Sequence, residues 1–105
     1  MTGVIGANGG STGSVTVSNG LWTNSGDLYV GSSGTGSLTI SGGVVVNGNG
    51  FVGLNGGSIG SVTVSNGLWS NSGDLQIGIS GTGSLTILGG GTVTDQNGTI
   101  GFEQL

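Results

Sequence analysis

The 105-residue chain contains 28 glycines and only 32% apolar residues, against about 45–50% in an ordinary soluble domain, so any core must be thin and regular. It has no Lys, Arg or His and four acidic residues, which argues against nucleic-acid binding and gives no attraction to an anionic membrane. The absence of Cys excludes disulfides and thiolate metal sites, and the charged fraction of 4%, with abundant Val, Ile and Thr, argues against disorder.

The chain begins MTGVIGANGG, which has neither the basic region nor the apolar region of a signal peptide. No apolar run approaches the roughly 18 residues of a membrane span. We therefore expect no membrane insertion by this segment, and we expect it to be an excised part of a longer protein.

An internal repeat dominates the sequence. GSVTVSNGLWTNSGDLYVG at 13–31 recurs as GSVTVSNGLWSNSGDLQIG at 60–78, displaced by 47 residues. Tripeptides such as VTV and LTI return every 23 or 24 residues, so each repeat contains two coils. We treat 1–105 as a single solenoid of about 4.5 coils, with a part-coil at 1–12 and double-coil repeats at 13–59 and 60–105.

Each coil contains three short apolar segments separated by turns rich in Gly, Ser and Asn. In chain order the third-type segment comes first, at 4–6, and the first-type and second-type segments follow, at 15–17 and 21–23. The sequence therefore predicts an all-β fold, a right-handed parallel β-helix (β-solenoid) with triangular coils of 23–24 residues. The corner after the third segment alternates between nine and seven residues, which makes the visible repeat 47 residues long and marks 7–13 and 54–60 as the most variable corners.

Three sets of apolar columns are predicted to face the interior. The strand period of two places alternate residues of the first and third segments inside, and a large ring alternating with valine fills the second. The columns are Val15, Val17, Leu38, Ile40, Val62, Val64, Leu85 and Ile87; Trp22, Val45, Trp69 and Val93; and Ile5, Val30, Val52, Ile77 and Ile100.

A polar column follows the second segment. It consists of Asn24, Asn47, Asn71 and Asp95. Stacked amides can hydrogen-bond along the axis of a cross-β stack, so we interpret this column as a structural ladder.

A face of hydroxyl groups is predicted on the outside of the first segments. Its spacings are about 4.8 Å between coils and about 6.8 Å along each strand. Such regular arrays resemble those of ice-binding β-solenoids, although Ser lacks the methyl group of Thr, and small polar residues also suit any uncharged solenoid surface. The face comprises Ser14, Thr16, Ser18, Ser37, Thr39, Ser41, Ser61, Thr63, Ser65, Ser84 and Thr86.

The acidic residues give no sign of an active site. Asp27 and Asp74 occupy equivalent SGD turns two coils apart, about 9.6 Å along the axis, at the loose edge of an inverting carboxylate pair. Asp capping its own turn is the ordinary explanation of such a residue. The sequence therefore predicts no catalytic residue, metal site or cofactor.

The segments NGLWTNSGDLYVGSSGTGSLTISGG (19–43) and NGLWSNSGDLQIGISGTGSLTILGG (66–90) carry a family resemblance. They resemble the repeat of type V secretion autotransporter passengers and PEP-CTERM-associated surface proteins, and the likeness covers essentially the whole chain. The resemblance implies a β-helical stalk exported by Gram-negative bacteria, displayed or released outside the cell and often adhesive.

Three functions follow, in decreasing order of support. The first is a structural and adhesive segment of a secreted or surface-displayed solenoid, stacking end to end with its own copies into fibres and contacting a host or matrix surface. The second is ice binding through the hydroxyl face. The third is a polysaccharide-binding or polysaccharide-degrading β-helix, which would need a catalytic group that the sequence does not offer.

Overall fold

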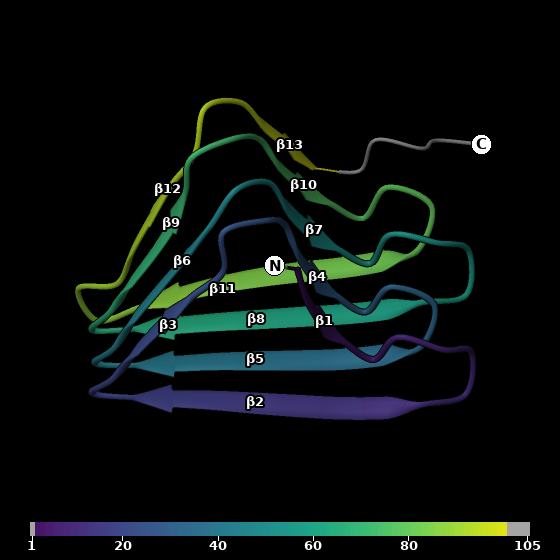
Figure 1. Ribbon diagram of the computed structural model, residues 1–105, viewed down its shortest axis with the longest axis horizontal. Coiled ribbons are helices and arrows are strands. Elements are labelled where there is room, and N and C mark those ends of the chain that lie inside the picture. Colours follow the sequence, from purple (N-terminus) through teal and green to yellow (C-terminus); the bar gives the residue numbers. More distant parts are fainter. Residues whose placement is uncertain (1, 101–105) are drawn as a thin grey trace.

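The structure is a computed structural model that describes residues 2–100. Within this range the chain forms thirteen strands and no helix. The strands belong to three parallel sheets that enclose a triangular tube, and each turn of the chain contributes one strand to every sheet (Figure 1). The prediction of a parallel β-solenoid with three strands per coil is confirmed.

Each sheet consists of equivalent strands from successive coils. The first sheet contains β2 (Thr12–Ser18), β5 (Thr35–Ser41), β8 (Ile59–Ser65) and β11 (Thr82–Leu88). The second contains β3 (Leu21–Thr23), β6 (Val44–Asn47), β9 (Leu68–Asn71) and β12 (Thr92–Thr94). The third has five strands, β1 (Gly3–Ile5), β4 (Leu28–Val30), β7 (Gly50–Val52), β10 (Leu75–Ile77) and β13 (Gly98–Ile100).

The register of the strands sets the coil length. Thr16 pairs with Thr39, Thr39 with Thr63, and Thr63 with Thr86, so successive coils differ by 23, 24 and 23 residues. Strands of the first sheet are seven residues long and begin earlier than expected, so Thr12 and Ile59 lie in strands rather than in the variable corners. The corners are shorter because the chain pairs with the neighbouring coil as soon as it turns.

The glycine column after the third strand has a backbone reason. Gly6 and Gly53 have φ values of 72° and 73°, a left-handed conformation that favours glycine. A methyl group on Gly53 would also collide with the carbonyl of Thr82 on the next coil. The chain can therefore turn this closely only with glycine.

The predicted apolar columns line the interior, and the middle coils bury them completely. Leu38, Val45, Val62 and Trp69 have no exposed surface. The last coil differs from the prediction, because Ile87 is 48% exposed and Ile100 is 81% exposed. Their side chains belong to the inward columns, but no further described coil covers them.

Large and small side chains alternate from coil to coil on the inner faces of the second and third sheets. Along the second sheet Trp22 and Trp69 alternate with valines, and along the third sheet glycine alternates with leucine in the sequence Gly3, Leu28, Gly50, Leu75 and Gly98. A methyl group on Gly50 would lie 3.1 Å from Cζ2 of Trp69, and one on Gly3 would lie 3.2 Å from Cζ2 of Trp22. Each indole ring therefore occupies the space that a side chain would take on the preceding coil's third strand.

Candidate functional site

The hydroxyl face is an in-register array on the outside of the first sheet. Thr16, Thr39, Thr63 and Thr86 form one column, and the predicted serines form columns on either side. Figure 1 shows the four long strands of this sheet stacked side by side. Because every row has the same register, the hydroxyls repeat in two directions across the face.

The face is one column wider than the sequence analysis predicted. Thr12, Thr35, Ile59 and Thr82 pair with one another at the start of these strands and lie two residues before the first serine column. The period of two, extended backwards from Ser14, was the signal that could have found them. Two apolar residues interrupt the array at opposite edges, Ile59 and Leu88, which are 49% and 51% exposed.

The hydroxyls of this face are not used inside the protein. Among residues 2–100, none of them makes a side-chain hydrogen bond to another protein group. Serines in the corners behave differently, since Ser11 Oγ donates to the carbonyl of Asn8 and Ser58 Oγ to that of Asn55, both at 2.6 Å. The donors and acceptors of the face are thus open to water or to an external ligand.

The polar ladder contains only one bond between two amides. Asn47 Nδ2 donates to Asn71 Oδ1 at 2.7 Å, but Asn71 Nδ2 turns to the carbonyl of Thr94 at 3.1 Å. Asn24 is 6% exposed, and its Nδ2 has no partner within the described residues. The three asparagines of the column are buried, and one bond along the axis joins two of them, while the amide of Asn71 bonds to a backbone carbonyl instead.

An unpredicted bond joins this ladder to the core. Trp69 Nε1 donates to Asn47 Oδ1 on the preceding coil at 2.7 Å, and both residues are buried. A buried indole N–H needs such an acceptor. Nothing in the sequence pairs these positions directly, since they lie 22 residues apart and belong to different columns.

The two aspartates of the SGD turns hold neighbouring coils together. The backbone N–H of Asn49 donates to Asp27 Oδ1 at 2.9 Å, and the backbone N–H of Asp74 donates to Asn49 Oδ1 at 2.7 Å. Asn97 Nδ2 then donates to Asp74 Oδ1 at 3.1 Å. These side chains link the turn of one coil to the next, and do not cap their own turns as the sequence analysis expected.

The outer surface of the third sheet carries one aromatic pair. The rings of Tyr29 and Phe51 stack with centroids 4.9 Å apart and planes inclined by 17°. The two residues pair directly across β4 and β7, where such cross-strand contacts stabilise a sheet by about 0.5–1.5 kcal/mol. We interpret this pair as structural.

Within residues 2–100, no three residues of the types His, Cys, Asp and Glu come together in a way that could hold a metal ion. The same range contains no helix that is long and apolar enough to cross a membrane. Comparison of the chain with family models, curated proteins and solved structures gives no match.

Proposed function

We propose that this chain is a structural segment of a surface-displayed β-solenoid and that the hydroxyl face is its adhesive surface. The observation that carries the proposal is that one set of polar side chains forms hydrogen bonds inside the solenoid and another set does not. The side chains of Asn47, Asn49 and Asp74 form bonds between coils, whereas the hydroxyls of the first sheet have no side-chain hydrogen bond to any residue in the range 2–100. An uncharged face of this kind favours a neutral, hydroxyl-bearing surface such as a matrix polysaccharide, which hydroxyl groups can bind without desolvating a charge.

Adhesion is tested by depletion of the purified chain onto insoluble cellulose and chitin. Thr39→Lys and Thr63→Lys place a long charged side chain at the centre of the face, and each should weaken binding by about tenfold or more because the contact can no longer be flat. Ser70→Lys is the matched control, since Ser70 is partly exposed on β9 of the second sheet. Equal loss in all three variants, or no binding by the parent chain, would contradict adhesion through this face.

Export to the cell surface rests on the resemblance of the repeat to autotransporter and PEP-CTERM-associated proteins. Antibodies raised against the chain should label intact source cells as strongly as permeabilised ones. Labelling that requires permeabilisation would overturn the proposed location.

Ice binding is the second candidate, and the regular register of the face favours it. Four rows repeat at about 4.8 Å, with hydroxyls about 6.8 Å apart along each strand. Thermal hysteresis measured for the parent chain and for Thr39→Lys and Thr63→Lys tests this candidate. No hysteresis in the parent would remove it.

We assign the chain no catalytic role. Asp27 and Asp74 are engaged with backbone and amide groups of adjacent coils, which accounts for both residues without a reaction. Release of soluble sugars from a polysaccharide incubated with the purified chain would overturn this assignment.

A further inference from the structure

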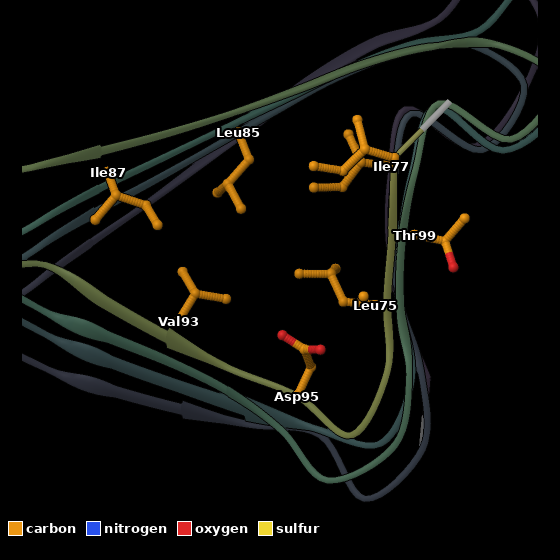
Figure 2. A pocket seen from close by; sticks show the side chains of 9 residues that line it. Leu75, Ile77, Leu85, Ile87, Val93, Asp95 and Thr99 are labelled. Atoms are coloured by element: carbon orange, nitrogen blue, oxygen red, sulfur yellow. The ribbon is translucent and has the colours of Figure 1, made fainter. Parts of the chain in front are cut away.

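The last coil leaves the interior of the solenoid open. An apolar cavity of about 260 Å³ lies there, lined by Leu75, Leu85, Ile87 and Val93 among others. Figure 2 shows the carboxylate of Asp95 directed into this cavity. The carboxylate of Asp95 makes no hydrogen bond within the described residues, so an acceptor without a partner points into a largely apolar space.

The cavity resembles the two sites in the solenoid that the indole rings of Trp22 and Trp69 occupy. Trp22 and Trp69 each reach over a third-sheet glycine of the preceding coil, namely Gly3 and Gly50. Gly98 is the next glycine of that column, and among residues 2–100 a methyl group on it would lie within 4 Å of the Asp95 carboxylate alone. The 47-residue period thus calls for a tryptophan at this point, supplied by the next coil.

The hydrogen bonds of the repeat also indicate an indole ring at this place. Trp69 Nε1 donates to Asn47, which lies on the preceding coil. Asp95 occupies the equivalent position two coils later and offers the same kind of acceptor.

The opposite end of the molecule carries the complementary groups. Trp22 lies in the first coil, is only partly buried, and has no hydrogen-bond partner for Nε1 among residues 2–100. A carboxylate oxygen of Asp95 can accept from this donor.

We propose that copies of this chain stack head to tail, with Trp22 of one copy inserted into the cavity above Gly98 of the next. Asp95 accepts from Trp22 Nε1 of the inserted copy. β2 of the second copy pairs with β11 of the first in the register by which β8 pairs with β5, and it covers Ile87 as β8 covers Ile40. The joint continues the repeat, leaves the hydroxyl face free and does not depend on adhesion.

The third sheet imposes a condition on this joint. It has five strands where the other sheets have four, so β13 of the first copy falls at the place of β1 in the second. Both strands read Gly-x-Ile, as Gly3–Ile5 and Gly98–Ile100, and β13 can therefore take the place of β1 beside β4. Stacking requires the release of β1 by strand exchange.

The same substitution at the two glycines has opposite expected effects. A methyl group on Gly3 would lie 2.9 Å from Asn24 Oδ1 and 3.0 Å from Leu28 Cδ1, so Gly3→Leu displaces β1 and favours association. A methyl group on Gly98 would lie 3.2 Å from Asp95 Oδ2, the end of a side chain that can turn aside, so Gly98→Leu is accommodated, fills the cavity and blocks the incoming ring. Leucine already stands at the neighbouring place in this column, Leu75.

The test is sedimentation equilibrium of the full chain over a wide concentration range, with circular dichroism as the check on folding. The parent mass should rise above 10.0 kDa with concentration. Gly3→Leu should associate at a concentration about tenfold lower, because the competing strand has lost its hydrogen bonds. Gly98→Leu should remain monomeric, and Gly98→Ala, a smaller plug, should weaken association less.

The double variant Gly3→Leu/Gly98→Leu separates the joint from non-specific aggregation. A specific joint returns this variant to the monomer, whereas association as strong as that of Gly3→Leu alone would overturn the proposal. Monomeric behaviour of both the parent and Gly3→Leu would also overturn it and would mean that another segment covers the cavity. Thr39→Lys, which lies outside the joint, should associate like the parent, so a failure of adhesion does not count against stacking.

Discussion

The indole ring of Trp69 fills the space above Gly50, and this packing yields a quantitative prediction. Trp69→Val replaces a fully buried ring by the residue found at that place on the neighbouring coils. Loss of a buried tryptophan costs about 3–5 kcal/mol when alanine replaces it, and valine retains part of the contact. With the lost bond to Asn47, the expected cost is about 3–4 kcal/mol.

Gly50→Leu tests the other partner in this packing. Its new side chain would meet Trp69, Leu75 and Asn71, with contacts between 2.5 and 3.1 Å from the first added carbon, and overpacking of this kind costs about 1–3 kcal/mol. In the double variant the leucine enters the space that the indole has left. We expect a favourable coupling of about 2–3 kcal/mol, which makes the double variant about as stable as Trp69→Val alone.

The assay is urea unfolding followed by far-ultraviolet circular dichroism, because each tryptophan substitution removes one of the two tryptophans and would itself change the fluorescence signal. Trp22→Val is the control, since its ring is only partly buried and should cost clearly less than Trp69→Val. If the two single costs simply add in the double variant, the ring and the glycine do not share one space. The argument that the cavity above Gly98 fits an indole ring would then fail as well.

Three further predictions can be checked by the same unfolding assay. Gly53→Ala should lower the free energy of unfolding by about 3 kcal/mol, because φ is 73° and the methyl group would collide with the backbone carbonyl of Thr82. Gly56→Ala is the control and should be nearly neutral, because the space around Gly56 is open. Equal costs for the two variants would contradict this account of the turn. Asn47→Ala should cost about 2–3 kcal/mol, since it leaves a buried indole N–H without an acceptor, and a change below 1 kcal/mol would show that water replaces the amide. Asp74→Ala should lower the free energy of unfolding by about 1 kcal/mol, because the bond from Asn97 on the next turn is lost. Asp95→Ala should change the stability of the monomer little. A larger loss of stability for Asp95→Ala than for Asp74→Ala would refute the roles assigned to the two residues.

Much of the fold could be predicted from the sequence because a parallel stack repeats its own environment. A residue such as Val62 lies between Leu38 and Leu85, which occupy the same place on adjacent coils, so similarity along the sequence directly predicts contact. The hydroxyl columns follow for the same reason, since a period of two on one strand and a constant register between strands fix which side chains share a face.

The arrangement of the polar groups could not be predicted in this way. Asn47 and Asn71 occupy the same column, yet Asn47 Nδ2 donates to Asn71 Oδ1 whereas Asn71 Nδ2 donates to the backbone carbonyl of Thr94, a difference that only the positions of the backbone decide. Asp27 and Asn49 stand directly before the paired residues Leu28 and Gly50, so the repeat aligns them, but only the conformation of the turns decides that Asp27 accepts from the backbone N–H of Asn49.

The sequence by itself determined the coil length, the three sheets and the residues of each column, because hydrogen-bonded layers at constant register leave no other way to stack nearly identical segments. Only the tertiary structure decided how the columns meet across the interior. Trp69 lies over Gly50 and bonds to Asn47 because the chain rises as it turns, which brings the second strand of one coil against the third strand of the coil before it. No ring of the described residues lies above Gly98 and Asp95, and this end of the solenoid therefore has a specific shape and chemistry.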